Sequence, residues 1–559
     1  MTLNSQIAYS ATVFDCAPAL YRERDEPMIS DEPCRREEAK HAASLRLDGI
    51  LWVSVFLFLF AMAAKSNYPD PTYRNQKFAY EYGNIAEAVV NGKGFANPFP
   101  LETGPTAWMP PFYVYLMAVV FKVCGAKSLL SLWVLMAVKF LGMSASLCLL
   151  LRAADQGGCG NSRYWMVPLF LVYIFAYGWQ FFSELHDIWL TQLLTCWLVY
   201  GLTSLATSSF RRGRMSLLLL SFILPLANPA LGLSLLFILL AWILIEWLDG
   251  KGKKGKEPLG AGRRAQRRQS RILLAALAIF ACSICIWSTR NYVVFGRLIP
   301  VKSNFWFDLY QANYHVSNGV VSCSTFMNYH PINLAPETMR HFAGGEQAFA
   351  EHFRRASIAD LRKDPGRMLR GFLSRAKNAF LLGDVYLDVV MVEKGRLVAS
   401  DVERLNGSSL VFRDPVSGSV HWTSLGLSKD DFYSVAGQLN LADVDRVVEG
   451  WEEAKGRYVA SRTAKRTMVK RLLCTGVPTL SILCCMLFRE VRESSVFILS
   501  FAIYSTYLLP YIVVSHYSRY QLGLVGLIVL FLFLSLRGVH ARAFGGDPSI
   551  AFRFRERLP

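Results

Sequence analysis

The segment from Phe78 to Pro111 reads FAYEYGNIAEAVVNGKGFANPFPLETGPTAWMPP, and it is polar and glycine-rich although its flanking segments are strongly apolar. The spacing of Tyr82, Ile85 and Val89 predicts a short helix over about residues 80–90, with Glu81 near its positively polarised N-terminus. Asn91 and Gly92 are expected to end this helix. Glu81 is then either an ordinary solvated carboxylate or a general base that acts on a substrate.

The composition around this segment is that of a membrane protein. The chain has 559 residues, of which 53% are hydrophobic, with a mean hydropathy of +0.28. Its repeated apolar runs have the length of about twenty residues that a hydrocarbon core requires. The net charge of +18 does not indicate nucleic acid, because Lys and Arg gather at the ends of the apolar runs, as the positive-inside rule describes. We therefore predict an α-helical polytopic membrane protein.

Five regions follow from the apolar runs and the charges. They are a flexible cytoplasmic tail (1–46), an N-terminal transmembrane module (47–288), an extracytoplasmic soluble region (289–466), C-terminal transmembrane helices (467–538) and a cytoplasmic tail (539–559). The module contains a first loop (65–110) and an interfacial helix (110–124), which is too short to be read as a span. About ten spans are predicted, near residues 50–64, 129–151, 165–177, 188–205, 215–225, 230–248, 272–287, 472–488, 496–514 and 522–536.

The soluble region is predicted to mix helices and strands. A helix is expected over about residues 347–362, and Asp364–Arg367 should break it before a second helix that ends near residue 381. Residues 410–422 alternate around Asp-Pro and Ser-Gly, which is typical of a β-hairpin. Cys323 is the single cysteine of this region, so no intramolecular disulfide is expected there.

A short set of reactive side chains falls in the predicted outer loops: Asp70, Glu81 and Glu87, then Glu184, His186 and Asp187, then Arg290 with Asn291, and finally Arg519. Each has a structural alternative: Asp70 as a turn residue, Asp187 as a helix cap and Arg290 as an interfacial anchor. The functional reading is that Arg290 or Arg519 holds a phosphate. Lys139 lies near the middle of a span, so it must pair with a carboxylate or line a polar cavity. No phosphate-loop or HExxH motif is found, and no metal site is predicted.

The residues Glu81-Tyr82-Gly83-Asn84-Ile85-Ala86, Gly92, Gly94-Phe95, Gly104-Pro105-Thr106-Ala107-Trp108 and Pro110-Pro111, with WSTRNYVVFGRLIP at Trp287–Pro300, resemble the GT-C glycosyltransferases. The likeness is strongest to bacterial members related to protein O-mannosyltransferases and lipid A aminoarabinose transferase. The resemblance implies a GT-C-like fold with interfacial helices, an acidic base in the first loop and a sugar donor on a polyprenyl monophosphate. Many members carry Asp a few residues before the Tyr-x-x-Ile-Ala pattern. Phe78 and Ala79 stand there in this chain, so the role of the base would pass to Glu81.

We accordingly expect Glu81 to be the base, with Asp70 or Asp187 as the next choices, Arg290 and Arg519 to bind the donor phosphate, and Tyr82, Trp108, His186 and Asn291 to bind substrate. One carboxylate suffices for inversion, because a phosphate leaving group needs no proton. The expected partners are a polyprenyl-phosphate sugar, membrane lipid and an acceptor left open among protein, lipid and glycan. No nucleic acid is expected, and a divalent metal is not required.

The short loops favour a bacterial plasma membrane with the site on the periplasmic side, and an endoplasmic reticulum membrane is the alternative. Two other functions stay open. A transporter or lipid flippase would fit Lys139 and Asn228-Pro229, although no internal repeat is found. A noncatalytic partner with a GT-C-like scaffold would fit the missing acidic residue before Tyr82.

Overall fold

The computed structural model describes the chain in separate stretches, namely residues 32–66, 77–158, 162–176, 182, 184–206, 210–252, 261–314, 321, 330–333, 336–381, 390–393, 396–398, 409–413, 420–424, 445, 469, 472–516 and 518–543. The chain divides into two compact units, residues 1–50 and residues 51–559. Apart from the first part of the helix that begins at Glu32, the features described here lie in the second unit. Asp70 and Cys323 lie outside the described residues.

Ten helices carry the predicted spans: α1 (Glu32–Ser66), α5 (Leu129–Gln156), α6 (Ser162–Ala176), α8 (Ile188–Ala206), α9 (Phe210–Ala227), α10 (Pro229–Gly252), α11 (Ala261–Phe295), α19 (Val477–Leu487), α21 (Ser495–Val513) and α22 (Val525–Ala543). In the described part of the chain, seven helical segments are long and apolar enough to cross a membrane, within α1, α5, α8, α10, α11, α21 and the run from Arg519 to Ala543. Helices α6 and α19 are shorter, and α9 opens with Arg211, Arg212 and Arg214. The protein is thus a helical membrane protein, and ten spans remain a prediction.

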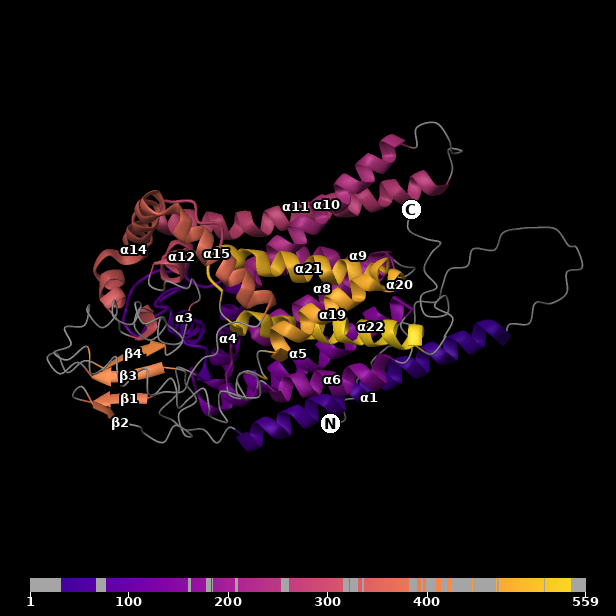
Figure 1. Ribbon diagram of the computed structural model, residues 1–559, viewed down its shortest axis with the longest axis horizontal. Helices are drawn as coiled ribbons and strands as arrows, with labels where there is room; N and C mark the ends of the chain where they lie inside the picture. Colours follow the sequence, from indigo (N-terminus) through magenta and orange to yellow (C-terminus); the bar gives the residue numbers. More distant parts are fainter. Residues whose placement is uncertain are drawn as a thin grey trace, which may run out of the picture. The chain divides into compact units, whose positions relative to one another are not determined.

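Helix α8 is the most buried of these candidate spans. It packs against α5, α9, α21 and α22 (Figure 1), and polar side chains join it to its neighbours. The Gln192 amide donates to Ser146 Oγ over 2.9 Å, and the Asn228 amide donates to Thr191 Oγ1 over 3.0 Å. Hydrogen bonds of this kind hold helices together where lipid removes the hydrophobic driving force between them.

Several predicted boundaries shift. Helix α1 begins at Glu32, inside the tail predicted as flexible, because residues 32–46 are rich in Ala, Glu, Arg and Lys, which favour helix. Helix α11 continues to Phe295, so Arg290 and Asn291 lie on its last turns rather than in the soluble region. The segment predicted as an interfacial helix is α4 (Pro111–Cys124), a 14-residue helix that begins with a proline at its first turn.

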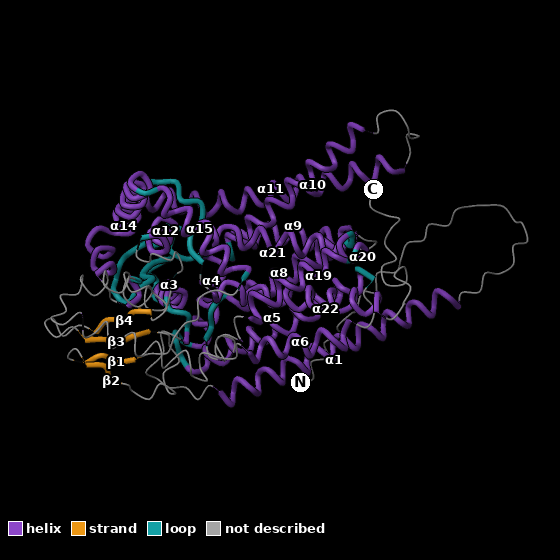
Figure 2. Tube along the Cα trace, in the orientation of Figure 1, coloured by secondary structure: helices purple, strands orange, loops and turns teal. Residues whose placement is uncertain are grey.

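The region after α11 mixes helices and strands (Figure 2). Its described elements are α12 (Phe305–Asn313), η2 (Pro331–Asn333), α14 (Pro336–Lys363), α15 (Pro365–Phe380), β1 (Val390–Glu393), β2 (Arg396–Val398), β3 (Ser409–Arg413) and β4 (Val420–Ser424). The strands form one sheet in the order β2-β1-β3-β4, and the β3–β4 pair is antiparallel with Val411 opposite Trp422. The predicted hairpin is therefore confirmed. So is the helix break, where the Asp364 side chain accepts from Arg367 N and starts α15.

Among the described residues of the second unit, buried apolar side chains form a large core and a smaller cluster. The large core lies among the candidate spans. A smaller cluster joins the first loop to the helices that follow α11, and it consists of Phe99, Trp108, Phe307, Ile332, Phe349 and Phe353. This second cluster fixes the first loop against α12 and α14, which matters for the site described next.

Candidate functional site

The first loop folds back on itself after the short helix α3 (Glu81–Val90), which matches the predicted helix. Thr106 N donates to Phe95 O over 3.0 Å, and Gly104 N donates to Asn97 Oδ1 over 2.8 Å. Gly104 has a φ of 78°, in the left-handed region where glycine carries no penalty. A Cβ at Gly83 would stand 2.6 Å from the Phe78 carbonyl oxygen, so the EYGNIA motif requires glycine there.

The backbone immediately before Glu81 is strained. Ala79 and Tyr80 have φ values of 59° and 48°, which non-glycine residues adopt at a cost. Surrounding hydrogen bonds hold this turn in place: Leu185 N donates to Lys77 O over 3.0 Å, and Asn84 N donates to Tyr80 O over 3.0 Å. Strain of this kind next to a buried carboxylate indicates that the position of Glu81 is tightly specified.

Arg290 fastens the two arms of the first loop. One terminal nitrogen donates to Thr106 O over 2.7 Å, and the other donates to Phe95 O over 2.9 Å. Asn291 beside it donates to Ile299 O over 2.9 Å and accepts from Arg290. The two residues predicted to bind phosphate and substrate therefore hold backbone carbonyls together.

Glu346 of α14 braces the same loop from the other side. Its carboxylate accepts hydrogen bonds from the Thr106 hydroxyl and, over 2.7 Å, from Ala107 N. Burial raises the pKa of this carboxyl, and these hydrogen bonds and the charge of Arg290 oppose the rise. Thr106 Oγ1 in turn accepts from Trp108 N over 2.9 Å. The loop carrying Trp108 is thus pinned between α11 and α14.

Glu81 is buried and lies beside a histidine. His330 Nε2 is 3.4 Å from Glu81 Oε1, and His330 Nδ1 accepts from Ile332 N over 3.3 Å. Because Nδ1 accepts, the hydrogen of the neutral ring lies on Nε2, the nitrogen that is 3.4 Å from the carboxylate. Burial and the charges of Arg519 and Lys302 lower the pKa of His330 to about 3, so the ring is neutral near neutral pH. The imidazole packs among the rings of Phe99, Trp108 and Phe307.

The charges of two cations, Lys302 and Arg519, act on this pair. Burial raises the pKa of Glu81, and the charges of Arg519, His186 and Lys302 oppose the rise. Lys302 follows a segment that α11 holds in place, since Trp287 Nε1 donates to Val301 O over 3.2 Å. Arg519 lies in η4 (Ser518–Leu524), just before α22.

A second carboxylate, Asp308, lies on α12 near the same cations. Burial raises its pKa to about 6, and the charges of Lys302 and Arg519 oppose this rise. Glu81, Asp308, Lys302, Arg519 and His330 thus form an electrostatic cluster of two carboxyl groups, two cations and a neutral imidazole. We call it the acid–base cluster.

The second predicted loop joins the acid–base cluster through Tyr82 and His186. Tyr82 Oη donates to Asp187 Oδ2 over 3.1 Å, and His186 Nε2 lies 3.0 Å from Glu184 Oε2. Burial raises the pKa of Glu184, but the hydrogen bond with His186 and the charges of His186, Arg519 and Lys139 outweigh it, so the net shift is downward. Lys139 donates to the Glu184 carbonyl over 2.6 Å, which supplies the partner that the sequence could not name.

Most of the predicted site residues therefore converge. Glu81, His186 and Arg519 interact electrostatically, Tyr82 bonds Asp187, and Trp108 contacts His330. Arg290 and Asn291 serve as a brace for the loop, and Asp70 lies outside the described residues.

Sequence reasoning missed the roles of His330, Lys302, Asp308 and Glu346. Nothing local in the sequence indicates that His330 lies beside Glu81.

No group of three or more His, Cys, Asp or Glu side chains is arranged to hold a metal ion within the described stretches. The chain matches no family model, no curated protein and no solved structure. The function must therefore be argued from the chemistry of the acid–base cluster. A buried carboxylate beside a neutral imidazole is suited to accept a proton, and two cations whose charges act on that carboxylate are suited to bind a phosphate.

Proposed function

We propose that the protein is a GT-C-like membrane glycosyltransferase that moves a sugar from a polyprenyl phosphate to an acceptor hydroxyl, with inversion. The observation that carries the proposal is the burial of Glu81 beside His330, where the charges of Lys302 and Arg519 act on it, and Arg519 begins the candidate span that runs to Ala543. A cation at the start of a candidate span is suited to hold a phosphate whose hydrocarbon tail remains in lipid. The proposed site faces the periplasm of a bacterial plasma membrane.

The proposed reaction is a single displacement. The acceptor hydroxyl oxygen forms a bond to the anomeric carbon while the bond from that carbon to the phosphate oxygen breaks. Glu81 takes the hydroxyl proton, and the electron pair of the broken bond leaves on the phosphate. Lys302 and Arg519 stabilise the charge that develops there. Because phosphate departs as a stable anion, the reaction needs no second carboxyl group to protonate the leaving group, unlike a glycosidase.

The arginine contacts decide which guanidinium the proposal uses. Arg290 already donates to two carbonyls and to Asn291, so releasing it to a substrate would loosen the first loop. Arg519 acts electrostatically on Glu81, Asp308 and His330, whereas the charge of Arg290 acts on Glu346. The donor phosphate is therefore assigned to Arg519 and Lys302, and Arg290 is assigned to positioning the loop.

The test is transfer in proteoliposomes. Purified protein is incubated with polyprenyl phosphates that carry radiolabelled hexoses or pentoses, together with an extract of the cell envelope as the source of acceptor. We expect the free polyprenyl phosphate to appear together with label in a new product. Movement of solute or lipid across the vesicles without any transfer would favour a transporter instead. The absence of both activities would favour a noncatalytic partner.

A further inference from the structure

Helix α15 is fixed against the end of a candidate span by a buried arginine. Arg375 is fully buried and donates to Ile512 O over 2.6 Å and to Val513 O over 2.9 Å, the last carbonyls of α21. Its third contact is Asn313 Oδ1 of α12, at 3.0 Å. Gln521 and Thr479 donate to carbonyls near the C-terminus of α15. Helix α15 therefore lies at the depth where α21 leaves the hydrocarbon.

The outward face of α15 is apolar. Leu369 and Leu373 are 60% and 58% exposed, and their spacing of four residues puts them on one face of the helix. Leucines exposed at the end of a membrane span indicate contact with the acyl region of a bilayer rather than with water.

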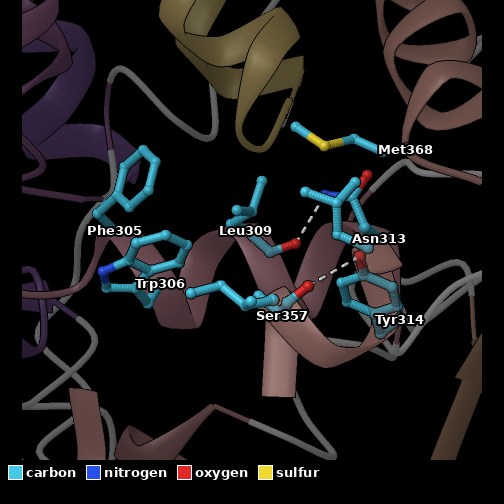
Figure 3. Close-up of a pocket in the computed structure, with 9 residues that line it drawn as sticks. Phe305, Trp306, Leu309, Asn313, Tyr314, Ser357 and Met368 are labelled. Carbon is cyan, nitrogen blue, oxygen red and sulfur yellow. Dashed lines mark hydrogen bonds between the residues drawn. The ribbon is translucent and has the colours of Figure 1, made fainter. Parts of the chain in front are cut away.

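An apolar cavity of about 210 Å³ opens beside this face, between α12, the end of α14 and the start of α15 (Figure 3). Its apolar lining consists of Phe305, Trp306, Leu309, Ile358, Leu361 and Met368. The polar groups at its edge are largely satisfied within the protein, since Asn313 donates to Leu309 O and Tyr314 donates to Ser357 O. The buried Ser357 hydroxyl has no hydrogen-bond partner among the described residues.

Cations surround the turn between α14 and α15. Arg362, Lys363 and Arg370 are exposed, and Arg367 is partly buried against Tyr314. Two carboxylates oppose them, namely Asp360 and Asp364, and Asp364 pairs with Arg370. A net positive rim next to an apolar cavity suits a ligand with an anionic head and a hydrocarbon chain.

We propose that α12, the end of α14 and α15 form a binding site for one anionic glycerophospholipid of the surrounding leaflet. An acyl chain fills the cavity, the glycerol ester accepts a hydrogen bond from the Ser357 hydroxyl, and the phosphate lies over the α14–α15 turn. This lipid is distinct from the sugar donor. The donor phosphate belongs to the acid–base cluster, and Phe307, which contacts His330, lies on the face of α12 opposite the cavity. The inference therefore stands whether or not the proposed transfer activity is found.

The test is photo-crosslinking in phosphatidylcholine proteoliposomes that contain the full chain. The probe is phosphatidylglycerol with a diazirine in one acyl chain, and crosslinked peptides are mapped by mass spectrometry. We expect capture within residues 305–314 and 357–368, and weaker capture there by a phosphatidylcholine probe. Each cation removed from the rim should weaken capture about fivefold, which corresponds to about 1 kcal/mol for a basic residue near an anionic lipid.

Two variants and one control separate lipid binding from misfolding. Leu361→Trp blocks the mouth of the cavity, and Arg362→Gln with Lys363→Gln removes two exposed charges. Both should lose capture at the cavity but keep crosslinks in the spans and an unchanged unfolding temperature. Arg211→Gln with Arg212→Gln on α9 removes the same charge elsewhere and should leave capture at the cavity unchanged.

Equal capture of both phospholipids at the cavity, or crosslinks confined to the spans, would overturn the proposal. Preferential capture of a diazirine-labelled polyprenyl phosphate at the cavity would also overturn it and would assign the cavity to the donor tail instead.

Discussion

The imidazole Nε2 of His330 lies 3.4 Å from the carboxylate of Glu81, which places a neutral ring beside the one acidic residue of the EYGNIA motif. The contact joins the first loop to a segment beyond α12, and a cage of aromatic rings holds the imidazole in place. An imidazole fixed in this way limits the orientations that the carboxylate can adopt.

His330 should therefore matter for rate more than for stability. His330→Phe keeps an aromatic ring in the cage but removes the ring nitrogen that lies 3.4 Å from Glu81 Oε1. We expect kcat for transfer to fall by roughly 10- to 100-fold, the effect of losing a polar partner of a charged group. His330→Gln retains an N–H donor and should recover part of the loss. A His330→Phe enzyme with the wild-type kcat would show that the contact has no role in the reaction.

The pH dependence of transfer follows from the burial of Glu81. Burial raises the pKa of this carboxyl above its ordinary value, and only the deprotonated form accepts a proton. The value of kcat/KM should therefore rise with pH through a pKa above that of an exposed glutamate and then level off. The profile is measured at saturating acceptor in mixed buffers. A flat profile between about pH 4.5 and pH 7 would be incompatible with Glu81 as the base.

Asp308 should make the protein less stable as pH rises. Its pKa is about 6 in the folded protein against an ordinary value of 3.8, so the folded state binds the proton more tightly than the unfolded state. The free energy of folding that this carboxyl contributes is fully present below pH 3.8, the ordinary pKa. It is lost as the pH rises through about 6, the pKa in the folded protein. Asp308→Asn should thus raise the unfolding temperature relative to wild type at about pH 7.5 and by less at about pH 5. Glu490→Gln, at an exposed carboxylate, is the control. A difference that grows toward low pH would reverse the assigned sign.

Substitution of Arg519 should weaken donor binding, whereas substitution of Arg290 should lower the stability of the fold. Arg519→Gln is expected to raise KM for the polyprenyl donor by roughly tenfold or more with little change in unfolding temperature, because it removes a phosphate ligand. Arg290→Gln is expected to lower the unfolding temperature, because the carbonyls of Phe95 and Thr106 lose their donors. Thermal unfolding and donor titration of both variants check this. Interchanged phenotypes would return the phosphate to Arg290.

Local chemistry explains what could be predicted from the sequence. The helix that begins at Glu81, the break at Asp364 and the hairpin around Val411 and Trp422 each depend on neighbours within a few residues. Propensity, capping and turn residues report such features directly. The helical membrane class followed from apolar runs for the same reason.

The site was harder to predict because it depends on contacts between distant segments. His330 and Lys302 carry no local signal that they interact with Glu81, and Asp308 carries none that it interacts with the same cations. Arg290 belongs to the motif that suggested a phosphate site, but in the structure it donates to two backbone carbonyls of the first loop. Composition and spacing do not distinguish an arginine that binds a phosphate from one that binds the backbone.

The most direct test of the account is the rate of sugar transfer by Glu81→Gln in proteoliposomes, measured beside wild type and the exposed control Glu102→Gln. The substitution keeps the size of the side chain but removes its capacity to accept a proton. We predict a fall in kcat of at least about 100-fold for Glu81→Gln, within the range of general-base catalysis, and an unchanged rate for Glu102→Gln. Transfer by Glu81→Gln at the wild-type rate would contradict the central claim.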